Sequence, residues 1–304
     1  MLTDYQNLRT LRDFVRWGAS AFNEAGVFFG HGTDNAIDES LALVLHAVHL
    51  DHEISGSYLD TETTDSERRS IVDLFERRIR ERIPAPYLIG EATFAGLPFY
   101  VNEHVLIPRS PIAELTERRF SPWLDAGAVD AVLDLCTGSG CIAVACAFAF
   151  PDARVDGVDV SRAALEVARR NRRRHHLEDH VQLIESDLFA DLEGRRYDLI
   201  VSNPPYVAKA EMQGLPAEYG WEPVLGLAAG EEGLDLVVRI LRDAGRFLSP
   251  GGIIVIEVGA AAEVLVNRYP QVPFLWLDFE RGGEGVFLLT ADQLDEYQHL
   301  FDTE

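Results

Sequence analysis

Residues 201–206 read VSNPPY and end an apolar strand pattern with an amide, two prolines and an aromatic ring. The two prolines remove two backbone donors, so the stretch predicts at least the end of a strand. Asn203 adds a side-chain hydrogen-bond acceptor, and Tyr206 adds a flat aromatic face. A plain strand terminator needs neither group, which makes these residues candidates for a chemical role.

A second segment, DLCTGSGCIA, covers residues 134–143 between a predicted strand and a predicted helix. Gly138 and Gly140 allow the backbone to turn tightly and to approach a ligand closely. Asp159 ends the next predicted strand, where a carboxylate can accept hydrogen bonds from both hydroxyls of a ribose. The pattern predicts a site for a ribose-containing ligand at the carboxyl ends of the strands.

The type of ligand is ambiguous from the glycines, because residues 138–143 also match G-x-G-x-x-A, the dinucleotide fingerprint. Asp134 favours a different ligand, since a carboxylate beside this loop would repel a pyrophosphate. S-adenosyl-L-methionine has no phosphate and carries two cationic groups, a sulfonium and an ammonium. Asp187 follows a third predicted strand and is placed to meet adenine or the substrate. We expect S-adenosyl-L-methionine, with NAD and a merely structural turn as the alternatives.

The loop DLCTGSG, the strand end at Asp159 and SNPPY together resemble the class I methyltransferases that methylate planar NH2 nitrogens. The resemblance implies that the tetrapeptide holds the target nitrogen, whose lone pair is shared with a carbonyl and is therefore a poor nucleophile. Acceptors on both N–H groups would orient that lone pair, and Asn203 Oδ1 and the Pro204 carbonyl are the two acceptors. Pro205 keeps Pro204 extended, and Tyr206 offers the amide a flat face.

Longer stretches are similar to the HemK/Prm glutamine-N5 methyltransferases over nearly the whole chain, namely GEATFAGLPFYVNEHVLIPR, LIPRSPIAEL and EPVLGLAAGEEGLDL. One branch of that family methylates the GGQ glutamine of peptide-chain release factors, typically reads LIPRPDTE and has a glycine at the position of Cys136. The other methylates a glutamine on the third protein of the large ribosomal subunit. LIPRSPIAEL and DLCTGSGCIA resemble the ribosomal-protein branch, which implies that protein as the substrate.

The predicted site follows from these segments. S-adenosyl-L-methionine, and its product S-adenosyl-L-homocysteine, would contact Asp134, Cys136, Thr137, Gly138, Ser139, Gly140, Asp159, Asp187, Leu188 and Asn203. Catalysis is assigned to Asn203, Pro204, Pro205 and Tyr206, and substrate binding to Asn203, Pro204, Tyr206 and Arg109. We expect no metal, because the three cysteines show no CxxC spacing.

Three alternative functions stay open beside release-factor methylation: an N6-adenine nucleic-acid methyltransferase, an NAD-dependent dehydrogenase and a noncatalytic donor-binding module. The net charge of −23 disfavours nonspecific binding to nucleic acid and would attract a basic partner over longer range, although the charge by itself favours a role in solubility alone. One basic cluster, ARRNRRRHH at 168–176, suits a helix C-terminus, with a weak contact to ribosomal RNA as the alternative.

The location is predicted from what the sequence lacks. The longest apolar run, residues 141–150, is far shorter than the roughly 20 residues of a membrane helix. The first residues, MLTDYQNLRTLRDF, do not resemble a signal peptide. Three cysteines crowded into residues 136–146 fit reduced thiols, so we expect a cytoplasmic protein without a membrane partner.

The elements that must position these residues form an α/β fold. We expect a helical substrate-recognition domain at 1–84, a β-hairpin linker at 85–108 and a methyltransferase domain at 109–304, with a Rossmann-like, seven-stranded and mostly parallel sheet. A capping box at Thr64 and Glu67 predicts one helix start. The chain is expected to close on the strands PFLWLDF and GVFLLT, and residues 207–232 to form an irregular loop that closes over the substrate.

Overall fold

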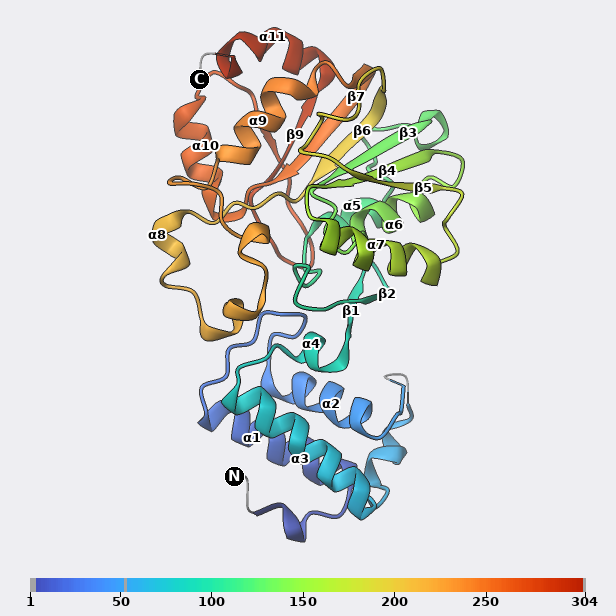
Figure 1. Ribbon diagram of the computed structural model, residues 1–304, viewed down its shortest axis with the longest axis vertical. Coiled ribbons are helices and arrows are strands. Elements are labelled where there is room, and N and C mark those ends of the chain that lie inside the picture. The colour runs from blue at the N-terminus through green and yellow to red at the C-terminus, as the bar shows by residue number, and fades with distance from the viewer. Residues whose placement is uncertain (1–3, 52–53, 303–304) are drawn as a thin grey trace. The chain divides into compact units, whose positions relative to one another are not determined.

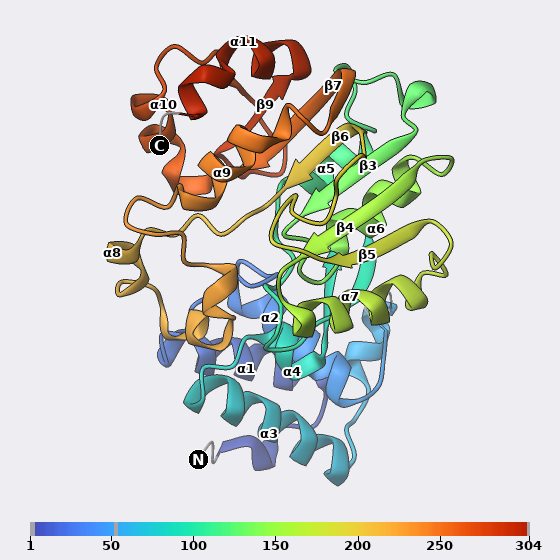
Figure 2. The same ribbon diagram turned by 45° about the horizontal axis from the view of Figure 1, so that its top comes forward.

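The computed structural model describes residues 4–51 and 54–302, which divide into two compact units (Figures 1 and 2). A helical unit contains Met1–Ala92, Val101–Glu103 and Pro216–Trp221. A sheet unit contains Thr93–Tyr100, His104–Leu215 and Glu222–Glu304. The chain therefore leaves the sheet unit and returns to it within the long segment that follows the Asn-Pro-Pro-Tyr sequence.

Among the described residues, the helical unit contains the α-helices α1 (Leu11–Glu24), α2 (Ala36–Ala47), α3 (Asp65–Arg80) and α4 (Ala85–Ile89). Short 3-10 helices stand at Asp4–Asn7, Gly56–Asp60 and Ala217–Trp221. The predicted capping box is confirmed, because the Thr64 hydroxyl accepts from the Glu67 backbone and the Glu67 carboxylate accepts from the Thr64 backbone. Helix α4 was not predicted, although Pro86 in its first turn suits a helix start. Buried phenylalanines from α1 and α3 fill the core.

A buried group of charges fixes the segment 216–221 within this helical unit. The Arg78 guanidinium, fully buried, contacts Glu39 Oε1 at 2.6 Å and Glu218 Oε1 at 3.1 Å. Glu218 also accepts from the Phe28 backbone at 3.0 Å, and the Trp221 indole donates to the Glu81 carbonyl at 2.9 Å. Buried charges without partners are costly, so this group strongly specifies where the segment lies.

The sheet unit contains seven strands in the order β5-β4-β3-β6-β7-β9-β8 (Figure 1). They are β3 (Ala131–Leu135), β4 (Arg154–Asp159), β5 (Val181–Glu185), β6 (Tyr197–Ser202), β7 (Leu248–Glu257), β8 (Leu275–Trp276) and β9 (Val286–Thr290). All neighbours pair in parallel except β9, which is antiparallel to β7 and β8. A separate hairpin, β1 (Glu91–Phe94) and β2 (Leu97–Tyr100), matches the predicted hairpin. The predicted fold class is confirmed.

Helices cover both faces of this sheet (Figures 1 and 2). One core packs α5 (Ile112–Glu117) and α6 (Cys141–Ala149) on the sheet, and α7 (Arg162–Arg174) lies beside α6. The other core packs α9 (Asp235–Ala244), α10 (Ala262–Arg268) and α11 (Ala291–Phe301). Short helical turns at Ala126–Ala128 and Gly259–Ala261 complete the unit. Within the described ranges, no helix is both long and apolar enough to cross a bilayer.

Three expectations about local structure were wrong. The chain does not close on two strands, because α11 follows β9 and starts at a capping box of Thr290 and Gln293. PFLWLDF forms only the two-residue edge strand β8. Residues 207–232 contain the short helices α8 (Lys209–Met212) and η5 (Val224–Gly226) and an isolated bridge from Val207 to Ala228, in addition to the 3-10 helix Ala217–Trp221.

Candidate active site

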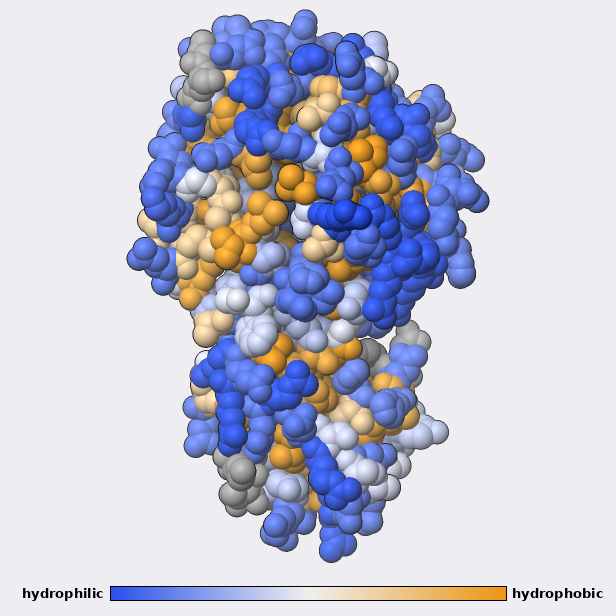
Figure 3. Space-filling view, viewed as in Figure 1, coloured by the Kyte–Doolittle hydropathy of each residue, from blue (hydrophilic) through white to orange (hydrophobic). Residues whose placement is uncertain are grey.

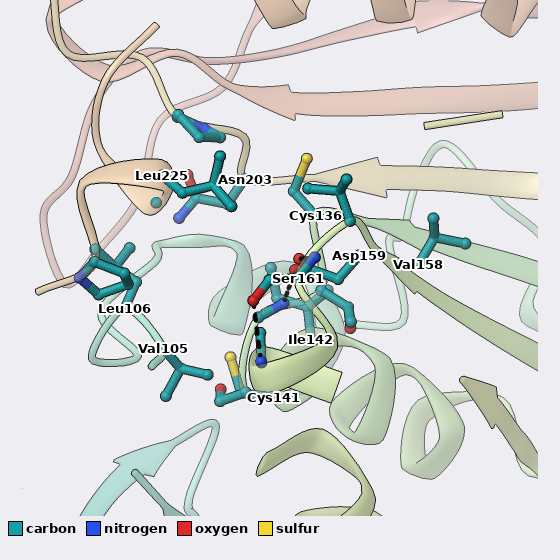
Figure 4. A pocket seen from close by; sticks show the side chains of 18 of the residues that line it. Val105, Leu106, Cys136, Cys141, Ile142, Val158, Asp159, Ser161, Asn203 and Leu225 are labelled. Atoms are coloured by element: carbon teal, nitrogen blue, oxygen red, sulfur yellow. Dashed lines mark hydrogen bonds between the residues drawn. The ribbon is translucent and has the colours of Figure 1, made fainter. Parts of the chain in front are cut away.

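The candidate site lies where the sheet order changes direction, between β3 and β6. Leu135 and Ser202 are register partners, so the glycine loop and the Asn-Pro-Pro-Tyr segment leave adjacent strands at the same level. Such a switch point is where ligands bind in parallel α/β sheets. A cavity of about 140 Å³ opens here, and all of its lining residues belong to the sheet unit. Asn203 and Asp159 come from different strands and both face it (Figure 4).

The glycine loop forms one wall of the cavity through Cys136, Thr137, Gly138 and Ser139. The Gly138 N–H donates to Asp159 Oδ2 at 2.9 Å, which ties the loop to the end of β4. Gly140 does not line the cavity; its φ is +79°, and a Cβ there would lie 3.1 Å from the Cβ of Ala168. Gly140 thus lets α6 and α7 pack closely, whereas Gly138 serves the loop itself.

Cys136 occupies the left-handed region of backbone space, with φ at +59°. This conformation favours glycine, which is the residue that the release-factor branch has here. The Cys136 side chain lines the cavity, and burial raises the pKa of its thiol well above the usual range. The thiol therefore stays protonated at neutral pH.

Asp134 lies beneath the loop and does not line the cavity. Its side chain is fully buried, accepts the Thr137 hydroxyl and accepts the Ala143 N–H in the first turn of α6 at 2.9 Å. Burial raises the pKa of Asp134 to about 7. Its Oδ1 atom is buried without a hydrogen-bond partner among the described residues. The Asp134 carboxyl group therefore stabilises the conformation of the glycine loop through its bonds to Thr137 and Ala143.

Two further carboxylates face the cavity directly. Asp159 accepts the Ser161 N–H at 2.8 Å, and burial raises its pKa. Asp187 is more exposed and pairs with Arg239 at 2.7 Å. Leu188, beside it, is buried and lines the cavity with φ at +51°. The side of the cavity near β4 and β5 thus presents two acidic groups to a ligand.

The Asn-Pro-Pro-Tyr segment contributes Asn203 and Pro205 to the lining, while Pro204 is buried and does not line it. Tyr206 is half-buried, and its hydroxyl donates to Glu257 Oε1 at 3.0 Å. Asn203 therefore faces the same cavity as the glycine loop, whereas Tyr206 does not line it. Sequence reasoning missed Glu257, although it ends strand β7 beside β6 at the same sheet edge.

Arg109 binds a protein carboxylate. Its guanidinium forms two hydrogen bonds with Glu222, one of them at 2.7 Å between Nη2 and Oε2. Glu222 is buried and also accepts the Ile107 N–H at 3.0 Å. The Arg109–Glu222 ion pair therefore links residues 106–110 to the segment around Pro223 and Leu225. Both stretches line the cavity.

The charges in the cavity fit a cationic donor. Arg109 is the only lysine or arginine among the described lining residues, and Glu222 neutralises it. Asp159 supplies negative charge to the lining, whereas the charge of Asp187 is shared with Arg239, 2.7 Å away. A pyrophosphate would find no free positive side chain in this lining, whereas a sulfonium and an ammonium would be attracted. The lining therefore favours a methyl donor over a dinucleotide.

Comparison with known proteins decides the family. Residues 120–217 match the model of the methyltransferase small domain. The ribosomal protein uL3 glutamine methyltransferase of Xanthomonas campestris is 50% identical over 94% of this chain and 93% of its own length. Its counterpart in Francisella tularensis is 46% identical over 97% of this chain and 94% of its own length.

The chain belongs to the ribosomal protein uL3 glutamine methyltransferases. Membership confirms the predicted family, branch and enzyme class. Among solved structures, the hMettl16 catalytic domain in complex with MAT2A 3′UTR hairpin 6 superposes with a TM-score of 0.50 over 78% of this chain and 86% of that chain. At 16% identity this likeness shows the fold alone.

Proposed function

We propose that this chain transfers a methyl group from S-adenosyl-L-methionine to the side-chain nitrogen of a glutamine on ribosomal protein uL3, the third protein of the large subunit. The placement of Asn203 carries the proposal: its amide faces the cavity directly beside the glycine loop that would hold the donor. The names of two relatives that match over almost the whole chain support the substrate.

The residues proposed to hold the donor are those that face the cavity around β3, β4 and β5. Asp159 would accept hydrogen bonds from the ribose hydroxyls, and Asp187 and Leu188 would border the adenine. Thr137, Gly138 and Ser139 would bring backbone close to the amino-acid end. When bound, the donor supplies a methyl group made electrophilic by the sulfonium.

The chain itself positions the nucleophile. Asn203 Oδ1 accepts one N–H of the glutamine amide, and the Pro204 carbonyl accepts the other. Pro205 keeps Pro204 extended, and Tyr206 bounds the slot that receives the planar amide. Orientation of this kind can contribute about 7–11 kcal/mol to lowering a barrier. The nitrogen then loses one proton to water, so the reaction needs no general base with a raised pKa.

The cellular setting follows from the substrate. We infer that the enzyme acts in the cytoplasm on uL3, either free or within an assembling ribosome. Methylation of release factors, methylation of adenine in nucleic acid and hydride transfer with NAD were the competing predictions, and the names of the relatives favour uL3 over all three. The acidic lining without a free cation argues against the dinucleotide.

A weak contact with ribosomal RNA is proposed for α7. This helix carries six arginines and one glutamate, and Figure 3 shows a continuous hydrophilic surface over it. Its first turn borders the cavity through Ser161 and Ala164. Replacing the exposed Arg162 and Arg173 with glutamine should weaken binding of an RNA fragment and reduce its log–log salt slope by about one for each phosphate that the protein no longer neutralises. An unchanged slope would exclude the contact.

The proposed function is tested by Asn203→Ala. This change should abolish methyl transfer to uL3 while S-adenosyl-L-homocysteine, measured by calorimetry, binds within about twofold of wild type. Ser202→Ala is the local control, because the Ser202 hydroxyl donates to the Leu135 carbonyl and does not line the cavity. Full activity of Asn203→Ala would refute the assigned role.

A further inference from the structure

Glu257 is a buried carboxylate directly behind the proposed substrate slot. It ends β7, is only 5% exposed, and accepts hydrogen bonds from two hydroxyl groups. Ser110 Oγ donates to Oε2, and Tyr206 Oη donates to Oε1 at 3.0 Å. Ser110 lines the cavity, whereas Glu257 does not. The carboxylate therefore joins a lining residue to the aromatic ring of the Asn-Pro-Pro-Tyr segment.

The direction of these bonds fixes the orientation of both hydroxyls. A hydroxyl has one proton to donate, and Ser110 and Tyr206 each give theirs to Glu257. Hydrogen bonds to a charged carboxylate are shorter and stronger than neutral ones. Burial raises the pKa of Glu257, while the bonds from Ser110 and Tyr206 oppose that rise. The phenol oxygen of Tyr206 is left with lone pairs only for any further contact.

Backbone closes in on the ring from another side. A Cβ at Gly259 would lie 2.6 Å from Cε2 of Tyr206, so glycine is required for the ring to lie where it does. A Cβ at Gly233 would lie 2.3 Å from the Tyr206 carbonyl oxygen. Gly285 in turn packs against Gly259, where its own Cβ would lie 2.3 Å from the carbonyl oxygen. Tyr206 is thus held at its tip by a carboxylate and along its ring and backbone by glycines.

We propose that Glu257, together with Ser110, is a positioning group for Tyr206 that sets the plane of the glutamine-binding slot. The inference rests on the proposed function and deepens it. Glu257 acts through Tyr206 and makes no contact with the donor cavity. Loss of the carboxylate should therefore disturb the geometry of transfer and leave donor binding intact.

The test compares wild type, Glu257→Gln, Tyr206→Phe and the double variant. Because a misplacement of about 1 Å can cost about 100-fold, Glu257→Gln should lower kcat for uL3 methylation by about 10- to 100-fold. The Kd of S-adenosyl-L-homocysteine should stay within about twofold. In the Tyr206→Phe background the same change should cost less than about threefold, because the bond between Tyr206 and Glu257 is already absent and only the bond from Ser110 remains.

Two additions keep the result interpretable. Ser110→Ala removes one donor and keeps the charge; it should lower kcat by about three- to tenfold, and it serves where Glu257→Gln does not fold. Glu114→Gln is the matched control, since Glu114 is equally buried and accepts the N–H groups of Glu280 and Arg281 away from the cavity. It should affect stability and leave kcat within about twofold.

The outcomes separate the two proposals. Absence of uL3 methylation by wild type would defeat the proposed function. NMR of labelled tyrosine, with Tyr206 assigned from Tyr206→Phe, then still reports whether Glu257→Gln speeds flipping of that ring, as positioning requires. Equal losses from Glu257→Gln with and without the Tyr206 hydroxyl, a kcat within twofold of wild type, or an unchanged ring-flip rate would overturn the positioning role.

Discussion

Gly259→Ala should impair catalysis by displacing one aromatic ring. The new Cβ would lie 2.6 Å from Cε2 and 2.9 Å from Cζ of Tyr206. Carbon atoms in contact prefer about 3.5–4.0 Å, so the ring must retreat by roughly 1 Å. A shift of that size near reacting groups costs about 100-fold in rate. We expect kcat for uL3 methylation to fall by about that factor, while S-adenosyl-L-homocysteine still binds.

A matched variant separates this displacement from backbone strain. Gly259 has φ at +46°, so alanine there also costs about 1–2 kcal/mol of stability. Gly194 has φ at +78°, and a Cβ there would meet no other atom within 4 Å, so Gly194→Ala carries the strain alone. Steady-state transfer by mass spectrometry and thermal unfolding should show both variants destabilised and only Gly259→Ala catalytically impaired. Equal activity of the two would refute the reasoning.

Three further predictions concern charge. Because burial raises the pKa of Asp159, donor binding by calorimetry should strengthen as the pH rises and Asp159 ionises, and Asp159→Asn should flatten this dependence. Folding raises the pKa of Asp134 from 3.8 to about 7, so the folded state binds that proton more tightly than the unfolded state does. The free energy of unfolding should therefore fall as the pH rises through this range. Urea unfolding of Asp134→Asn should lack that fall. Arg78→Met leaves Glu39 buried without its cation and leaves Glu218 with only Arg82, 3.6 Å away. The change should cost about 3–5 kcal/mol in urea unfolding; a loss below about 1 kcal/mol would contradict it.

Much of the fold was predictable from local sequence patterns, because helices and strands are specified mainly by residues that lie close together in the sequence. Alternating strands and helices give the parallel sheet, and the capping box at Thr64 gives the start of α3. A capping box at Thr290 and Gln293 marks the start of α11 in the same way, but this helix was not predicted from the sequence. Of the strand predicted at PFLWLDF, only the two residues of β8 form a strand, and β8 pairs on one side only.

The site was predictable where strand ends determine it. Asn203, Asp159 and the glycine loop follow adjacent parallel strands, so they must meet at one edge. The partner of Arg109 was not predictable, since tertiary packing brings Glu222 to it from 113 residues away in the sequence. Glu257 could have been placed at the same sheet edge from the end of β7, but its bond with Tyr206 depends on how the chain turns after β6. Asp134 was expected to face the donor, and its strand instead directs it beneath the loop.

The central claim is that Asn203 presents a glutamine amide of uL3 to the donor. The direct measurement incubates the enzyme with isotopically labelled S-adenosyl-L-methionine and, in parallel, with purified uL3, a release factor and ribosomal RNA, followed by peptide mass spectrometry. The account predicts one labelled methyl group on a uL3 glutamine side chain, and none when Asn203→Ala replaces wild type. Label on the release factor or on RNA alone would contradict it.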